Sequence, residues 1–268
     1  MIAPGESGGK YAPSAGPGEP ATAGSLPPGR PPRILRLHLA SLSGPDGGVW
    51  PVHGFVILHE QAGPILVDSG VGGPEQWLTD WRVVNVSAAD ALAQHDLLPS
   101  DIRIVINTHL HFDHCGQNAV FKHAPFYVQR NELERARRES RPLLDWFDFA
   151  GARFELLDGD TQIAEGVRVL ATPGHTVGHQ SVMVATGVAG EELMIGDAAY
   201  TSHIYEKPNR EQLPSGQAAD REAWNRSIEH IHSLKPGQVH FCHDTAVVHF
   251  PARRGGPSGA AGGGGAVS

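Results

Sequence analysis

The segment Thr108–His114, with the sequence THLHFDH, constrains this chain of 268 residues more than any other feature. It follows directly on IRIVIN, a short β-rich run that predicts a buried strand. Residues two apart in an extended chain point the same way, so His109 and His111 can share one ion. If the chain turns after His111, Asp113 and His114 can face a second, adjacent ion. Any fold for this chain therefore needs a strand that ends where further ligands can gather.

Three more strand ends deliver side chains of the same kind. His175 follows a Pro-Gly turn, Asp197 follows an apolar run and a glycine, and His243 follows the last predicted strand. With the first segment they offer five imidazoles and two carboxylates, in a chain that contains 16 His. This set suits zinc, while cobalt, manganese and iron accept the same ligands. A carboxylate has two oxygens, so Asp197 can bridge two ions, and the sequence predicts a dinuclear site.

The pattern of apolar runs predicts an α/β layered fold with mixed sheets. Helices are expected at Ser87–His95, with Ser87 as the capping residue, at Asn131–Ser140 and at Ala219–Leu234. The charges of Asn131–Ser140 predict that this helix faces solvent. Strands are expected at Arg33–Leu42, at the hairpin Val52–Leu58 and Pro64–Val67, at Ile102–Asn107 and Ala124–Val128, in a meander of Phe154–Leu157, Thr161–Ala164 and Val167–Ala171, and at Ser181–Ala185, Glu192–Ile195 and Gln238–Cys242.

Composition sets the boundaries of the folded part. Residues 1–32 and 251–268 are rich in Pro and Gly, which predicts a disordered tail at each end of a domain spanning residues 33–250. No apolar run is long enough to span a membrane. The formal net charge of -8 argues against nucleic acid as a partner. The absence of a secretory signal and the low cysteine count favour the cytoplasm, with Cys115 and Cys242 as free thiols that fill space beneath the loops.

At these residues the chain resembles the metallo-β-lactamase superfamily, from about Ile34 to Phe250. The resemblance implies a four-layer αββα sandwich with mixed sheets and metals at one sheet edge. It also implies that Asp68 supports the metal-binding loop. Within the superfamily the chain is most similar to the N-acyl-homoserine lactonases, through the stretches GPILVDSG, THLHFDHCGQN, TPGHTVGHQS and GDAAYT. Those lactonases suggest a homodimer.

The resemblance also implies roles for individual residues. His109, His111 and His175 would bind one metal, Asp113, His114 and His243 would bind the other, and Asp197 would bridge them. Tyr200 matches the position of a catalytic tyrosine, whose hydroxyl can donate to a carbonyl oxygen. Asp113 would carry a proton to the departing alkoxide.

The predicted function is a metal-dependent hydrolase that opens the lactone ring of N-acyl-homoserine lactones through a metal-bridging hydroxide. The same site also suits a thioesterase of the glyoxalase II type, a β-lactamase or a phosphodiesterase. A mononuclear iron persulfide dioxygenase uses a similar fold but needs only three protein ligands. A metal-binding module without catalysis is disfavoured because the ligand set leaves open positions for water.

Several other residues bear on these alternatives. The acyl tail needs an apolar groove, for which the candidates are Val49, Trp50, Phe55, Trp77 and Trp81. The loops near the site are poor in basic residues apart from Lys207 and Arg210, which disfavours anionic substrates. Direct roles are not expected for His179 or His203. The remaining histidines, His53 among them, are expected to face solvent or to form local hydrogen bonds.

Overall fold

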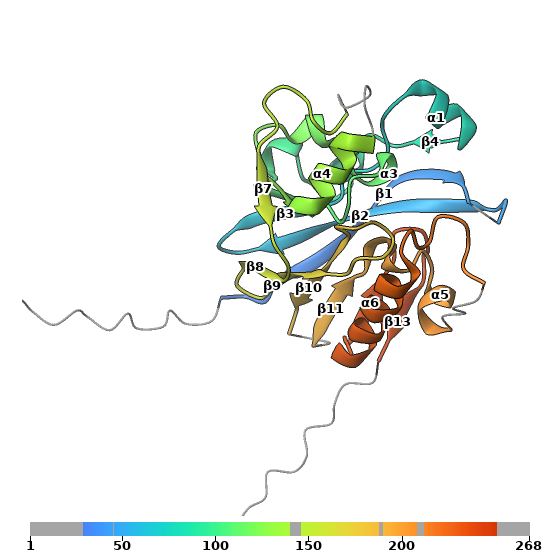
Figure 1. Ribbon diagram of the computed structural model, residues 1–268. Coiled ribbons are helices and arrows are strands. Elements are labelled where there is room, and N and C mark those ends of the chain that lie inside the picture. Colours follow the sequence, from blue (N-terminus) through green and yellow to red (C-terminus); the bar gives the residue numbers. More distant parts are fainter. Residues whose placement is uncertain (1–28, 45, 140–145, 188–189, 208–211, 251–268) are drawn as a thin grey trace, which may run out of the picture.

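The computed structural model describes residues 29–44, 46–139, 146–187, 190–207 and 212–250 of the chain. These residues form two mixed β-sheets that pack face to face, with helices on both outer surfaces (Figure 1). The architecture is the expected four-layer αββα sandwich. Almost all of the two predicted tails, residues 1–28 and 251–268, lies outside the described residues, and residues 29–32 form neither helix nor strand.

The first sheet has seven strands in the order β4-β1-β2-β3-β5-β6-β7. The predicted hairpin is confirmed, since β2 and β3 pair antiparallel, and β3, β5, β6 and β7 then run parallel. The strands are β1 (Arg33–Ser43), β2 (Val49–His59), β3 (Gly63–Val67), β4 (Val84–Asn85), β5 (Ile104–Ile106), β6 (Phe126–Gln129) and β7 (Phe154–Leu157).

The second sheet has six strands in the order β13-β12-β11-β10-β9-β8. Its strands are β8 (Thr161–Ala164), β9 (Val167–Ala171), β10 (Gln180–Ala185), β11 (Glu191–Met194), β12 (Gln238–His240) and β13 (Val247–His249). The predicted meander is wrong in one respect, because β7 pairs with β6 in the first sheet and only β8 and β9 continue into the second. The ring of Phe154 in β7 packs against that of Phe126 in β6, with the ring centroids 5.9 Å apart, and this contact favours the pairing of β7 with β6.

Helices cover the outer face of each sheet. The first sheet carries α1 (Glu75–Asp80), α2 (Ala88–Ala93), α3 (Phe112–Cys115) and α4 (Arg130–Glu139), and the second carries α5 (Ser202–Glu206) and α6 (Arg221–Leu234). Ser87 caps α2 as predicted, by accepting the Asp90 N–H, although α2 ends at Ala93 rather than His95. The cap of α6 is Asp220, and its apolar stripe of Trp224, Ile228 and Ile231 is buried against the second sheet.

The space between the sheets is filled by inward-facing apolar residues, including Ile57, Val67 and Ile106 from one sheet and Val169 and Val182 from the other. Burial of these side chains on both sheets fixes how the sheets face each other. The loops after β5, β9, β11 and β12 consequently meet at one edge of the sandwich. None of the described helices is both long and apolar enough to cross a membrane.

Candidate metal centre

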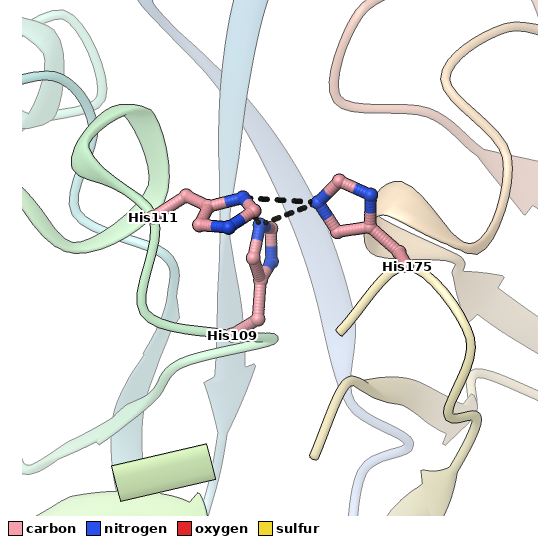
Figure 2. Close-up of side chains that lie close together, drawn as sticks. All are labelled: His109, His111 and His175. Atoms are coloured by element: carbon pink, nitrogen blue, oxygen red, sulfur yellow. Dashed lines mark hydrogen bonds between the residues drawn. The ribbon is translucent and has the colours of Figure 1, made fainter. Parts of the chain in front are cut away.

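Three imidazoles converge at this edge from two distant segments. His109 follows β5, His111 precedes α3, and His175 lies in the turn after β9. His111 Nδ1 lies 3.0 Å from His109 Nε2 and 3.0 Å from His175 Nε2, while the two Nε2 atoms are 3.1 Å apart (Figure 2). All three nitrogens therefore point at one small volume.

The other ring nitrogens determine which atoms carry protons. His175 Nδ1 faces the carbonyl oxygen of Gly216 at 2.9 Å and must donate to it. His109 Nδ1 lies 3.1 Å from Thr108 Oγ1, whose own proton is directed to Asp68 at 2.7 Å, so this nitrogen also donates. The Nε2 atoms of both rings consequently present lone pairs to each other.

Burial keeps these rings neutral. It lowers the pKa of His109 well below its ordinary value, that of His111 to about 3 and that of His175 to about 4. Neutral rings with lone pairs 3.1 Å apart repel each other unless a cation lies between them. The arrangement thus fits a metal ion bound by three imidazoles.

A second cluster forms where the chain turns into α3. His114 Nδ1 donates to Asp68 at 2.8 Å and His243 Nδ1 donates to the Pro51 carbonyl at 3.0 Å. Both Nε2 atoms then face Asp113 Oδ2, at 3.7 and 3.6 Å. They also face Oδ1 of Asp197, at 3.3 and 3.4 Å. Burial opposes protonation of the two rings, yet the carboxylates of Asp197 and Asp113 outweigh it and raise both pKa values.

Asp197 lies between the two clusters, with one oxygen directed to each. Its Oδ2 is 3.4 Å from His175 Nε2 and 3.8 Å from His109 Nε2, while its Oδ1 faces the second cluster. This Oδ1 and His114 Nε2 are both buried without a hydrogen-bond partner among the described residues. Two orphaned polar atoms that face each other across the cluster fit a site that binds a cation. His179 supports Asp197, because its Nε2 accepts the Asp197 N–H at 2.9 Å.

The structure therefore brings together all seven side chains that the sequence singled out. It also contains a support that the sequence analysis missed. The helix α4, which the sequence predicted to face solvent, has one buried side. Glu132 lies on that side and is fully buried. Its carboxylate accepts the N–H groups of Leu110 at 2.9 Å and Gly178 at 3.2 Å, and so joins the two loops that carry the first cluster. The spacing of Leu133 and Ala136, which are also buried, was the available signal.

The clusters open into a cavity of about 410 Å³. Trp50, Trp77 and Trp81 line it as predicted, whereas Phe55 is buried between the sheets and Val49 points away into solvent with 79% exposure. The complete lining is Leu42, Trp50, Trp77, Trp81, Leu110, His111, Phe112, Asp113, Arg135, Trp146, His175, Asp197, Tyr200, Ser215, Gly216 and His243. The cavity thus combines an apolar wall with the polar groups of the two clusters.

Tyr200 forms part of this cavity next to both clusters. Its ring centroid lies 5.6 Å from those of His175 and His243 and 5.5 Å from that of Trp50. Burial raises the pKa of the phenol, and the nearby carboxylates of Asp197 and Asp113 raise it further. The hydroxyl therefore keeps its proton and remains a donor.

Residues with no expected direct role mostly behave as predicted. Cys115 and Cys242 are buried, and burial raises the pKa of both thiols, that of Cys242 to about 12. His203 is exposed. His53 does not face solvent, because it is buried in β2. Its ring forms a hydrogen bond with the Phe241 backbone, while its Nδ1 has no hydrogen-bond partner in the described part of the chain. Lys207 is exposed and does not line the cavity, and Arg210 lies outside the described residues.

Comparison with known proteins gives consistent matches. Residues 47–243 match the family described as the metallo-beta-lactamase superfamily. An N-acyl homoserine lactonase of Bacillus sp is 33% identical over 165 residues, which are 56% of this chain and 65% of that protein. The AttM N-acyl homoserine lactonase of Azorhizobium caulinodans is 32% identical over 152 residues, or 51% of this chain and 54% of that protein. The matches thus span less than two thirds of these relatives.

Solved structures agree over a longer stretch. A mutant of Bacillus thuringiensis AiiA with N-decanoyl-L-homoserine bound at its active site superposes with a TM-score of 0.67 at 25% identity. The match covers 81% of this chain and 94% of that chain. An N-acyl homoserine lactone hydrolase with N-hexanoyl-L-homoserine at its catalytic metal centre gives a TM-score of 0.66 at 26% identity, with the same coverage.

Proposed function

Because the chain belongs to the metallo-beta-lactamase superfamily, we propose that it is a metal-dependent hydrolase that opens the lactone ring of N-acyl-homoserine lactones. The observation that carries this proposal is the pair of ligand clusters, linked by the two oxygens of Asp197, at an aromatic-walled cavity that also contains Tyr200. The similar proteins are N-acyl homoserine lactonases, and one similar structure holds the product N-hexanoyl-L-homoserine at its catalytic metal centre, which supports the same substrate class.

The proposed ligands divide into two sets. One ion would be held by His109, His111 and His175, and the other by Asp113, His114 and His243, with Asp197 as a ligand of both. Zinc is the proposed metal, and cobalt, manganese or iron would fit the same donors. When bound, the two ions would supply a hydroxide at neutral pH that attacks the lactone carbonyl.

The residues around the ions would complete the reaction. The protonated Tyr200 hydroxyl would donate to the substrate carbonyl oxygen as negative charge develops there. Asp113, whose side chain is 13% exposed at the cavity, would accept the proton of the added hydroxide and transfer it to the departing alkoxide. The tryptophans of the opposite wall would receive the acyl chain. The proposed catalytic domain comprises residues 33–250, and the homodimer suggested by the resemblance stays a prediction.

The competing reactions fit the cavity less well. Glutathione thioesters and phosphodiesters are anionic, and Arg135 is the one Lys or Arg side chain among the described residues that line the cavity. Its charge is already opposed by Glu132 and Glu139. A persulfide dioxygenase would use a single ion, which leaves the donors of Asp113, His114 and His243 without a purpose.

The test combines metal analysis with a substrate panel. The purified chain should contain two ions, and a pH indicator should report acid release from acyl-homoserine lactones faster than from a thioester or a β-lactam. His243→Ala should abolish this activity, while His203→Ala, at an exposed histidine outside the cavity, should keep it. A metal-loaded preparation that opens none of a series of acyl-homoserine lactones would refute the proposal.

A further inference from the structure

Arg135 is the strongest feature of the cavity that the proposed reaction does not use. It lies on α4 and contributes a guanidinium to the lining, with 11% of its side chain exposed. Apart from the indole N–H groups of the tryptophans, the other polar side chains of the lining belong to the two ligand clusters, to Tyr200 or to the exposed Ser215. Arg135 is therefore the one charged donor in the described wall away from the reacting centre.

Two glutamates of the same helix fix this guanidinium. Nη2 lies 2.5 Å from Glu132 Oε1, and Nη1 lies 2.5 Å from Glu139 Oε2. Nε also donates to Glu132, at 3.4 Å. The buried Glu132 is in turn bound to the Leu110 and Gly178 N–H groups, so the guanidinium is anchored to the loops of the metal centre. A side chain held in this way loses little entropy when it binds a ligand.

The count of donors shows what Arg135 has left to offer. A guanidinium carries five N–H groups, and three of them are directed to the two glutamates. One N–H on each terminal nitrogen is therefore not used by the described residues. Because Arg135 belongs to the cavity lining, these are the two donors with which it can bind a molecule in the cavity.

The local charge decides what kind of molecule these donors suit. The Arg135 guanidinium faces the carboxylates of Glu132 and Glu139. Burial would raise the pKa of Glu132, but its interaction with Arg135 outweighs burial and lowers that pKa, so Glu132 and Arg135 are both ionised. The group as a whole carries one net negative charge. An anion would be repelled by the carboxylates, whereas a neutral carbonyl oxygen can accept a hydrogen bond without that penalty.

We propose that Arg135 is a specificity-determining residue that donates a hydrogen bond to a carbonyl oxygen in the acyl part of the substrate. This inference rests on the proposed lactonase function. The cavity wall formed by Leu110, Phe112 and Trp146 offers no side-chain charge, so an acyl carbonyl buried there would lack a charged donor without Arg135. Substrates with a second carbonyl at the 3-position can use both free N–H groups.

The test compares three lactones with the metal-loaded wild type and Arg135→Met. They are N-hexanoyl-homoserine lactone, its 3-oxo derivative, and γ-decanolactone, which has an alkyl chain but no acyl carbonyl. Loss of a charge-assisted hydrogen bond should lower kcat/KM for both acyl-homoserine lactones on the order of 10- to 100-fold, chiefly through KM. The value for γ-decanolactone should change by less than about threefold. If the wild type does not turn over γ-decanolactone, its inhibition constant serves for the same comparison.

Matched variants separate recognition from a structural effect. Arg138→Met lies on the same helix outside the cavity and should leave all three values unchanged. Arg135→Lys keeps a positive charge beside the buried Glu132 but lacks the planar fork that leaves two N–H groups free, and should show the same selective loss if Arg135→Met does not fold. An equal loss for all three lactones would overturn the role of Arg135, whereas a metal-loaded wild type that opens no lactone would overturn the proposed function as well.

Discussion

Replacing Asp68 by asparagine tests how strictly the second cluster depends on a residue that would not itself bind a proposed ion. Asp68 is buried at the end of β3 and accepts the Thr108 N–H at 2.8 Å, the Thr108 hydroxyl at 2.7 Å and His114 Nδ1 at 2.8 Å. Its φ is 58°, in the left-handed region that Asn also tolerates. The exchange therefore leaves the backbone unstrained and changes only the donors and acceptors.

The magnitude follows from these three bonds. Asp68→Ala would leave three buried donors without an acceptor, and each would lower the free energy of unfolding by about 1–3 kcal/mol. The total approaches the free energy of unfolding of a typical domain, about 5–15 kcal/mol. In Asp68→Asn, the new NH₂ group must face either the Thr108 N–H or His114 Nδ1. If it faces His114, the ring proton moves to Nε2, the atom directed at Asp113 and Asp197. We therefore expect the affinity of the second site to fall about 10- to 100-fold.

Elemental analysis under a graded chelator measures this effect directly. Asp68→Asn should retain fewer ions per chain than the wild type at intermediate chelator concentrations. The loss should fall chiefly on the second cluster, because His114 binds Asp68 directly whereas His109 depends on it only through the Thr108 hydroxyl. Asp160→Asn is the control, since that exposed carboxylate accepts a single backbone N–H, from Ala171. Equal retention of both ions by Asp68→Asn and the wild type would refute the reasoning.

Three further predictions concern other parts of the site. Tyr200→Phe should lower kcat for lactones about 100-fold with little change in KM, as steady-state kinetics will measure, and an unchanged kcat would remove the phenol from the reaction. Gly174→Ala should displace the His175 turn, because the added Cβ would lie 2.4 Å from the Trp224 Cα; reduced metal content and a lower Tm are expected, and a wild-type Tm would contradict this. The metal-free protein should lose stability as the pH falls from about 6.5 towards 4. In the folded chain the pKa values of His111 and His175 are about 3 and about 4, below their ordinary value of 6.5. The unfolded chain therefore binds more protons than the folded chain in this pH range, and protonation favours unfolding. Thermal unfolding at pH 7 and pH 5 checks the sign, and equal Tm values would count against neutral buried rings.

The ligand clusters were largely predictable because their chemistry is local. The alternation of His109 and His111 at a strand end, and the turn that follows, are set by backbone geometry over a few residues. The turn before His175 and the glycine before Asp197 likewise mark strand ends in the sequence. The pairing of β2 with β3 followed from two apolar runs and a polar turn for the same reason.

Long-range packing decided what the sequence pattern could not. The pattern of apolar runs did not predict that β7 joins the first sheet. This pairing depends on the contact between the rings of Phe154 and Phe126, which lie 28 positions apart in the sequence. The same holds for Glu132, which lies on a helix whose charges predict exposure to solvent. Its carboxylate is buried because it accepts hydrogen bonds from two loops elsewhere in the chain. Residue type and spacing thus determine which groups can bind a cation and at which strand ends they lie. How many of them share a site, and what shapes the cavity above it, depends on contacts between segments far apart in the chain, because burial and hydrogen bonding are settled only when the two sheets close on each other.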